Sequence, residues 1–199
     1  MSPPQGGLQI ALKEWDVVCR LLLQGRQVVL VRKGGIHEPR RGFAIEHERF
    51  FLYPNVEHQN PQQLQPAYHP LLADAPPPPD ERGTVVLPGF CRVVDVLPAA
   101  GAPRLHALQQ HSCWTADFFD ARLRYKPERP LFLVTVRCYR LPRPLELPYH
   151  KLYAGCRSWV PLRETVPESA LDEAEPALGD AAFEAQRQAV LKAGLRTER

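Results

Sequence analysis

The sequence predicts an α+β fold, with a mixed or partly closed barrel-like sheet flanked by helices and an acidic C-terminal helical tail. Three observations support this fold class. Several short β-branched or apolar runs are bounded by glycine and proline, as strands usually are. Segments with the apolar spacing of helices precede these runs and lie among them. The two kinds of segment do not alternate regularly, as they would in a doubly wound parallel sheet.

The first third of the chain is expected to form a helix followed by strands. Residues 8–23 carry apolar side chains at the i, i+3, i+4, i+7 spacing of an amphipathic helix, and Gly25 is placed to end it. A β-branched run predicts a strand over residues 27–32, halted by a following pair of glycines. Two further short strands are expected at residues 42–45 and 49–53.

A proline-rich segment separates these strands from the rest of the chain. Nine prolines fall between residues 54 and 88, and four of them are consecutive at residues 76–79. Proline fixes φ and cannot donate to a sheet, so we expect a long loop or lid with one short helix, and polyproline II at the four-proline run. Loops of this length inside compact domains are usually functional or disordered.

Ordered elements are expected to resume after this loop. Two short strands at residues 84–87 and 90–97 flank a Pro-Gly pair. Helical spacing then predicts a broken pair of helices at residues 103–110 and 115–124, the second with Thr115 placed to cap it.

The strongest strand signal is the run LFLVTVRCYRL at residues 131–141, which two prolines bound. A further strand is expected near residues 158–162 and a helix over residues 180–193. This pattern predicts one α+β domain over residues 1–163 and an acidic, partly helical tail over residues 164–199.

Length and composition describe a soluble globular protein. The chain has 199 residues, 44% hydrophobic and 24% charged, close to globular averages. No apolar run approaches the roughly 20 residues of a membrane span, and the N-terminus lacks the features of a secretory signal, so a cytoplasmic location is expected. Five cysteines without a CxxC pair predict reduced thiols, because neither a disulfide framework nor a zinc site is signalled.

The formal net charge of +3 conceals a basic body and an acidic tail. Residues 1–163 hold 21 Lys and Arg against 14 Asp and Glu, whereas residues 164–199 hold four against eight. Between residues 122 and 163, ten basic residues face two acidic ones, and aromatic residues are interspersed. Cations neutralise phosphates and rings stack on unpaired bases, so the pattern is typical of a nucleic-acid-binding surface. An ordinary solvated basic face is the alternative.

The candidate nucleic-acid-binding residues lie mainly where predicted strands end. The peptide RKGGI at residues 32–36 can offer charge and backbone N–H groups to an anion, although two glycines after a strand also form ordinary turns. The strand at residues 131–141 becomes polar on both faces near its end, as at the rim of a groove or at a frayed end. The expected phosphate contacts are Arg32, Lys33, Lys126, Arg137, Arg140 and Arg157, and the expected stacking rings are Tyr139 or Trp159.

A second polar cluster lies at residues 46–59. Metal binding or acid–base catalysis requires imidazole and carboxylate groups in convergent geometry. On a strand, His47 and its two glutamate neighbours point to opposite faces. The pattern therefore favours solvated residues or a polar binding wall over a metal site, and no metal is expected. The residues of this polar wall are His47, His58 and Gln59.

No catalytic motif is legible in the sequence. Of the five lysines, none lies two residues after an acidic residue on a predicted strand, as a PD-(D/E)xK nuclease requires. RKGGI matches neither GxGxxG nor the P-loop pattern, so nucleotide binding by those routes is disfavoured. Cys156 has cations nearby but no partner base, which indicates an inert thiol. No cofactor is expected.

Four separated blocks of the sequence match a known family in their order and spacing: ALKEWDVVCRLLLQGRQVVLVRKGGI, FAIEHERFFLYPNVEHQ, YKPERPLFLVTVRCYRL and YAGCRSWVPL. They resemble the bacterial family catalogued as domain of unknown function 1802. The resemblance covers most of residues 10–162 and departs at residues 75–80 and after Arg163. That family has no established activity, and its domain is sometimes associated with a restriction-endonuclease catalytic domain of the Mrr type. The resemblance implies a stand-alone specificity or DNA-binding partner and assigns no residue.

The leading prediction is a non-enzymatic nucleic-acid-binding module, a specificity or accessory component of a bacterial restriction or defence system. Its expected partners are nucleic acid, with DNA favoured, and a nuclease subunit, but no membrane. One alternative is a metal-dependent nuclease or hydrolase that uses Glu46, His47 and His58. The other is a protein-interaction subunit that docks through the acidic tail or the proline-rich loop. The tail could also compete with nucleic acid for the basic face.

Overall fold

A computed structural model describes residues 7–33, 36–37, 44–45, 47–76, 83–99, 101–155 and 157–194. Its strands and helices, in chain order, are β1 (Leu8–Trp15), α1 (Asp16–Leu23), β2 (Val29–Arg32), β3 (Ile36–His37), β4 (Ala44–Ile45), β5 (Arg49–Asn55), α2 (His69–Ala73), β6 (Thr84–Pro98), α3 (Ala102–Ala107), α4 (Ala116–Arg124), β7 (Phe132–Pro148), β8 (Trp159–Val166), β9 (Glu175–Pro176) and α5 (Asp180–Gly194). Short 3-10 turns are η1 (Pro61–Gln63), η2 (Pro66–Tyr68), η3 (Leu108–His111), η4 (Lys151–Tyr153) and η5 (Glu168–Ala170).

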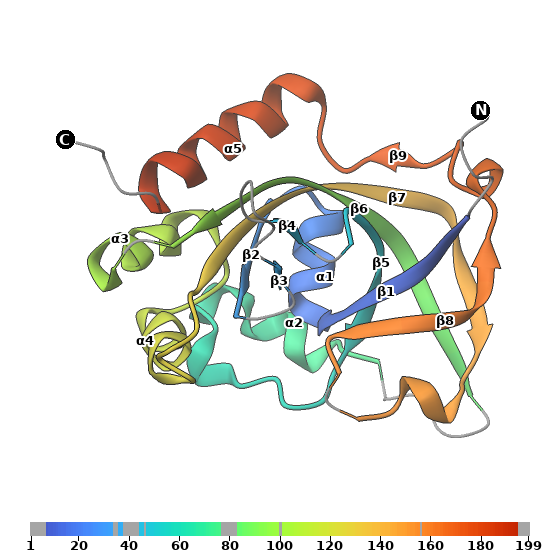
Figure 1. The fold of residues 1–199 in the computed structure, drawn as a ribbon, viewed down its shortest axis with the longest axis horizontal. Helices are drawn as coiled ribbons and strands as arrows, with labels where there is room; N and C mark the ends of the chain where they lie inside the picture. The colour runs from blue at the N-terminus through green and yellow to red at the C-terminus, as the bar shows by residue number, and fades with distance from the viewer. Residues whose placement is uncertain are drawn as a thin grey trace.

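Within the described residues, seven strands form one mixed sheet in the order β2-β7-β6-β5-β1-β8, and β9 adds to β7 (Figure 1). The β1–β5 pair is parallel, and the other pairs of this sheet are antiparallel. The fold is therefore α+β, as predicted. The expected partial closure into a barrel is wrong, because β2 and β8 are the two ends of the strand order and do not pair with each other.

Residues 8–23 form a strand and a helix, not the single predicted helix. Leu8 and Ala11 of β1 pack in one hydrophobic core, whereas Leu12 packs in the other, so this strand is buried on both faces. A segment with buried residues on both faces lacks the strict alternation of a half-buried strand, so spacing alone does not distinguish it from a helix. The helical prediction holds for α1, which ends before Gly25 as expected, with Gly25 at φ +67.

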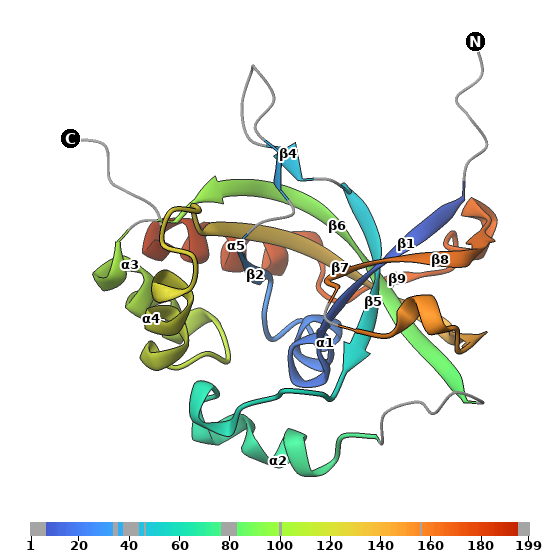
Figure 2. The same ribbon diagram turned by 60° about the horizontal axis from the view of Figure 1, so that its bottom comes forward.

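The long antiparallel pair of β6 and β7, which α3, η3 and α4 connect, arches over α1 (Figure 2). Two short strands were predicted where β6 runs unbroken from Thr84 to Pro98. Pro88 and Gly89 lie at a register shift of the ladder and not at a turn. A side chain at Gly89 would place its Cβ 2.2 Å from the Tyr139 carbonyl oxygen, so the close approach of β7 requires glycine there.

The buried residues form two hydrophobic cores. The first is formed by α1, α3, α4 and α5 with both faces of β2 and of the start of β7, and it includes Phe50 and Val134. The second lies among β1, β5, β8 and the paired ends of β6 and β7 that begin at Thr84 and finish at Pro148, and it includes Phe51, Tyr53 and Tyr153. The alternation of Phe50 and Phe51 between the two cores follows from the period of two along a strand.

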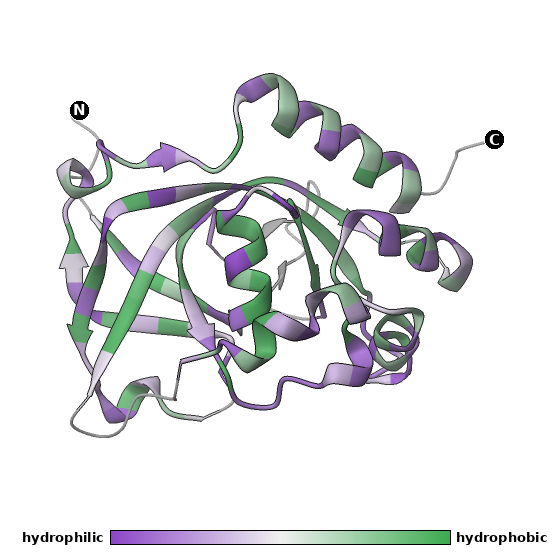
Figure 3. Cartoon of the chain, turned by 180° about the vertical axis from the view of Figure 1, so that it is seen from behind, coloured by the Kyte–Doolittle hydropathy of each residue, from purple (hydrophilic) through white to green (hydrophobic). Residues whose placement is uncertain are grey.

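The C-terminal segment is part of the packed structure. The predicted helix at 180–193 is confirmed by α5, whose hydrophobic and polar residues alternate along the helix in Figure 3. Phe183 and Val190 are buried in the first core. The strand expected at 158–162 extends to Val166 as β8.

The connecting segments are partly as predicted. The described part of the proline-rich segment holds η1, η2 and α2, so one short α-helix is present there. Most of the four-proline run lies outside the described residues, as do the glycines of RKGGI. Thr115 stands at the N-cap of α4, but its hydroxyl donates to the Gln62 carbonyl at 3.1 Å and not to the helix. No helix among the described residues is long and apolar enough to cross a membrane.

Candidate functional site

The predicted nucleic-acid-binding residues fall in three separate places. The first place is the C-terminal end of α4, next to which the end of β2 lies. Three of the predicted residues are there: Arg32, Lys33 and Lys126. The second is the middle of β7, beside β9 and the start of α5, with Arg137, Tyr139 and Arg140. The third is the segment from η4 to the start of β8, with Arg157 and Trp159. The structure therefore does not gather the predicted set into one surface.

A basic surface surrounds the end of α4. This α4 basic surface consists of Lys33, Arg122, Arg124, Tyr125, Lys126 and Arg129. The Lys33 ammonium donates to the carbonyls of Arg122 at 2.9 Å and Leu123 at 3.1 Å, which are the last carbonyls of the helix. A cation at a helix C-terminus interacts favourably with the helix dipole. Glu128 is the one acidic residue between residues 122 and 129.

Tyr125 projects from this surface. Its side chain is 54% exposed, and the Lys126 ammonium lies 5.2 Å from its ring centroid. Lys126 has φ +46, in the left-handed region that residues other than glycine seldom adopt. The sequence contained a signal that Tyr125 is exposed. In the peptide RLRYKPER it lies among cations, and none of the large apolar residues follows it.

Arg32 is held within the fold. Its guanidinium pairs with the Glu14 carboxylate at 3.3 Å, and its side chain is only 14% exposed. Burial lowers the pKa of the Arg32 guanidinium, while the neighbouring Glu14 opposes this shift. Arg32 therefore contributes positive charge next to α4, but its low exposure limits direct contact with an external anion.

Three arginines on adjacent strands form an arginine row: Arg49, Arg92 and Arg137. The register of β5, β6 and β7 places Arg92 opposite both of the others. Like charges directly opposite one another are destabilising, so acidic partners stabilise such a row. Glu168 pairs with Arg49, and Asp180 pairs with Arg137. Arg92 is exposed and makes no hydrogen bond or ion pair with any described residue.

The acidic C-terminal segment thus lies against the row. Hydrogen bonding from Arg49 holds the pKa of the Glu168 carboxyl below its usual value, burial opposes this, and the charges of Arg49 and Arg92 add to the lowering. Arg140 lies three residues after Arg137 on β7. It pairs with Glu175 at 3.8 Å and donates to the Leu23 carbonyl at 3.2 Å.

The two rings predicted to stack on bases already have ring partners. Tyr139 is stacked on Phe90 with ring centroids 4.9 Å apart. Trp159 meets Phe50 edge to face at 5.1 Å and His47 at 5.0 Å. Arg157 is exposed beside the segment that carries Trp159.

The residues of the predicted polar wall have different environments. His47 packs on Trp159, and His58 is exposed at φ +60 in the turn after β5. The Gln59 side-chain oxygen accepts a hydrogen bond from the Val17 amide at 3.2 Å, which satisfies a free N–H in the first turn of α1. Glu46 lies outside the described residues. In the part of the chain that the structure describes, no three His, Cys, Asp or Glu gather as metal ligands.

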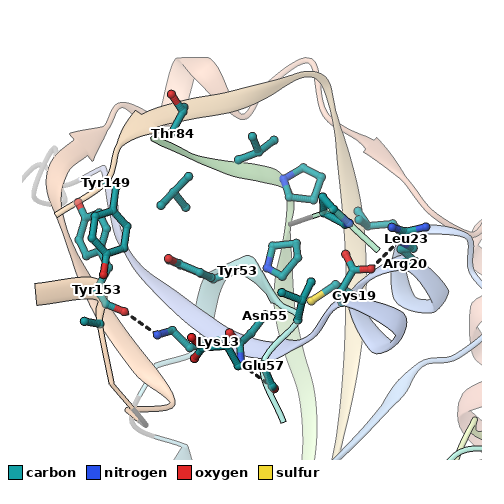
Figure 4. A pocket seen from close by; sticks show the side chains of 18 of the residues that line it. Lys13, Cys19, Arg20, Leu23, Tyr53, Asn55, Glu57, Thr84, Tyr149 and Tyr153 are labelled. Carbon is teal, nitrogen blue, oxygen red and sulfur yellow. Dashed lines mark hydrogen bonds and ion pairs between the residues drawn. The ribbon is translucent and has the colours of Figure 1, made fainter. Parts of the chain in front are cut away.

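A cavity that sequence reasoning missed lies between β1, α1, the end of β5, the start of β6 and η4 (Figure 4). We call it the tyrosine pocket, after the three tyrosines that line it: Tyr53, Tyr149 and Tyr153. Its volume is about 530 Å³. The Tyr153 ring lies 6.4 Å from that of Tyr53 and 6.3 Å from that of Tyr149. The lining residues are spread along the chain between Lys13 and Gly155, so no local sequence motif identifies the pocket.

Three of the four charged side chains that line the pocket are paired within the protein, whereas the Glu57 carboxylate has no partner among the described residues. Asp16 and Arg20 form an ion pair at 2.8 Å on one side. Burial raises the pKa of the Asp16 carboxyl, and Arg20 opposes that shift. On the other side, the Lys13 ammonium donates to the backbone carbonyls of Tyr153 and Gly155, the latter at 3.1 Å.

Tyr53 has an uncharged hydroxyl at neutral pH. Burial, with smaller contributions from Tyr149, Tyr153 and Glu57, raises the pKa of Tyr53 to about 12. The side chain is only 4% exposed, and its hydroxyl makes no hydrogen bond with any described residue.

The thiols of the described cysteines are not activated. Cys19, Cys91, Cys113 and Cys138 are buried and free of disulfide bonds. Burial raises the pKa of the thiols of Cys19, Cys91 and Cys113, so they stay protonated at neutral pH. Cys156 lies outside the described residues.

A family model with the description "Domain of unknown function (DUF1802)" matches residues 11–189. The match continues past residue 162, where the sequence blocks quoted above end, and includes β8, β9 and most of α5. No curated protein matches the chain.

Proposed function

This chain belongs to the DUF1802 family, and from that premise and its surface chemistry we propose that it is a nucleic-acid-binding module that uses the α4 basic surface. The family description assigns no activity, so the proposal rests on the residues. In this proposal the cations contact phosphates and Tyr125 stacks on an unpaired base. A role beside a nuclease subunit in restriction or defence is the biological setting that we propose for such a module.

The observation that carries the proposal is Tyr125 in its setting of cations. Arg124, Lys126 and Arg129 are all exposed around a tyrosine that is itself 54% exposed. Phosphate contacts supply salt-dependent affinity that is independent of sequence, while stacking on an aromatic ring is worth about 1–3 kcal/mol per base. This combination suits single-stranded or locally unpaired nucleic acid better than an intact duplex.

The backbone at Lys126 gives further support. A left-handed conformation at a residue other than glycine costs on the order of 1 kcal/mol and is concentrated at functional sites. The reversal at Lys126 turns the chain directly after Tyr125, so the ring remains outside the fold while Phe118 and Phe119 of the same helix are buried.

The test is fluorescence anisotropy of labelled single- and double-stranded DNA and RNA, repeated over a series of salt concentrations. Changing Arg124 and Lys126 to alanine should weaken binding and reduce the slope of log affinity against log salt by about 0.7 per lost contact on single strands. Tyr125→Ala should weaken single-strand binding by roughly 5- to 100-fold and leave the salt slope unchanged.

Arg143→Ala, an exposed cation on β7 outside the α4 basic surface, is the matched control and should bind as the wild type does. Absence of binding at low salt to all four nucleic acids would overturn the proposal. Equal losses for the control and for the Arg124 and Lys126 variants would show only general charge attraction and would also contradict it.

A further inference from the structure

We propose that the tyrosine pocket binds a nucleobase, an uncharged planar heteroaromatic ring with hydrogen-bonding edges. This inference goes beyond the proposed function, because none of the residues of the α4 basic surface lines the pocket. The base could belong to a free nucleoside or to an unpaired nucleotide in a strand, and the chemistry of recognition is the same for both.

Size and lining fit a flat ring. The cavity of about 530 Å³ falls within the roughly 300–1,000 Å³ typical of small-molecule sites. Tyrosine rings lie on one side, and Pro54, Val86 and Pro88 add apolar surface. Figure 4 shows Tyr149 and Tyr153 across the cavity from Cys19 and Arg20, with Tyr53 projecting between them. Aromatic walls of this kind bury a planar ligand by stacking and edge contacts.

The Tyr53 hydroxyl is available to a hydrogen-bond acceptor in the cavity. Tyr53 is only 4% exposed and lines the cavity, and no described residue pairs with its hydroxyl. The hydroxyl is not among the fully buried unpartnered atoms, so water can reach it from the cavity, and an acceptor on a ligand would replace that water. Its phenol is protonated at neutral pH and so acts as a donor. A purely aliphatic ligand would leave this donor unpaired.

The pocket also favours an uncharged ligand. Asp16 and Arg20 neutralise each other at 2.8 Å, and backbone carbonyls hold the Lys13 ammonium. The Glu57 carboxylate, which also lines the cavity, would repel a phosphate placed there. Asn55 donates one amide N–H to the Glu57 carbonyl at 3.2 Å, which leaves its side-chain oxygen and second N–H for a ligand. Phenol and amide together match the acceptor and donor edges of a base.

The rim suits the rest of a nucleotide. Lys151 lies between Tyr149 and Tyr153 in the sequence, and Arg157 follows Gly155 by two residues. Both side chains are exposed, outside the cavity. With the base inside, a sugar and phosphate would emerge on the side that carries these two cations.

The experiment is isothermal titration calorimetry of the full chain with adenosine, guanosine, cytidine and uridine, with sodium decanoate as an aliphatic probe. At least one nucleoside should bind with a stoichiometry of one. Loss of the single hydroxyl in Tyr53→Phe should weaken that binding by about five- to tenfold. Val86→Trp, at a residue that is 44% exposed at the pocket, should abolish binding by filling the space without disturbing a core.

Tyr68→Phe is the matched control, because it removes a tyrosine hydroxyl outside both the pocket lining and the α4 basic surface, and it should leave nucleoside affinity unchanged. A parallel titration with a single-stranded oligonucleotide separates the two proposals. If Tyr53→Phe weakens nucleoside binding while Arg124 and Lys126 variants weaken only oligonucleotide binding, both sites are supported. If no nucleoside binds, or if decanoate alone binds and Val86→Trp removes it, the pocket inference is overturned whatever the oligonucleotide result.

Discussion

Arg187 of α5 and Asp95 of β6 form a bidentate ion pair between residues 92 positions apart in the chain. The guanidinium Nε donates to Oδ2 and Nη2 donates to Oδ1, both at 2.6 Å. The Thr135 hydroxyl on β7 donates to the same carboxylate. The two side chains are only 21% and 15% exposed. The C-terminal helix is therefore attached to the sheet by a directional polar contact as well as by buried apolar side chains.

Arg187→Ala should lower the free energy of unfolding by about 2 kcal/mol, because charge-assisted hydrogen bonds of this kind contribute about 1.5–3 kcal/mol and the remaining Asp95 carboxylate would be partly buried. Arg187→Lys should recover less than half of that loss, since an ammonium cannot reproduce the planar fork. Urea unfolding measures both. Lys192→Ala, an exposed cation on the same helix, is the control and should change stability by less than about 0.5 kcal/mol. Recovery of the full wild-type stability by Arg187→Lys would argue against a bidentate contact.

The same pair predicts how stability responds to acid. Hydrogen bonding from Arg187, with help from Thr135 and against a smaller opposing effect of burial, holds the pKa of the Asp95 carboxyl below its usual value. A carboxyl whose pKa is lower in the folded state stabilises the fold above the unfolded pKa of about 3.9. That contribution is lost as the pH falls through the lower folded pKa.

Unfolding in urea at several pH values should therefore show a loss of stability below about pH 4 in the wild type. Asp95→Asn should be less stable at pH 7, and the gap between the two proteins should narrow as the pH falls below 4. A gap that stays constant down to pH 2 would show that Asp95 titrates normally in the folded protein.

The elements that the sequence predicted well are those whose patterns are local. For α5 the expected range of 180–193 differs by one residue from the observed end, because Asp180 begins a run rich in helix-forming residues. Strands β2 and β5 begin within two residues of their predicted starts. In these segments the backbone preference, the apolar spacing and the boundary residues all agree.

Other features depend on contacts between distant parts of the chain. Residues 8–15 form the strand β1 and not a helix because other strands bury them on both faces. The sequence of these residues does not reveal that burial. The arginine row exists because register aligns three strands, and its partners Glu168 and Asp180 come from the acidic segment. No spacing rule in a single sequence links Arg49 to a glutamate 119 positions away.

The pairing of the arginine row with the acidic segment predicts a gain of affinity on removing the acids. The double change Glu168→Gln and Asp180→Asn releases Arg49 and Arg137 beside the exposed Arg92. Nucleic acid should then bind severalfold more tightly at low salt, and the salt slope should steepen by about 1–2. Anisotropy titrations measure both quantities. The double change Asp172→Asn and Glu173→Gln, which removes two exposed acids that pair with no described cation, is the control for net charge. An equal gain for the control would mean that only net charge matters.

Gln59 is expected to stabilise α1 and to have no part in a binding wall. Its side-chain oxygen accepts the Val17 N–H at 3.2 Å, and Trp15, at the N-cap of α1, makes no side-chain hydrogen bond to the helix. Loss of a helix-capping acceptor costs about 0.5–2 kcal/mol, so Gln59→Ala should lower stability by about 1 kcal/mol in thermal or urea unfolding. Gln62→Ala, an exposed glutamine three residues further along, should not. Gln59→Ala should also bind nucleic acid as the wild type does. Unchanged stability together with weaker nucleic-acid binding would instead identify Gln59 as part of a polar binding wall.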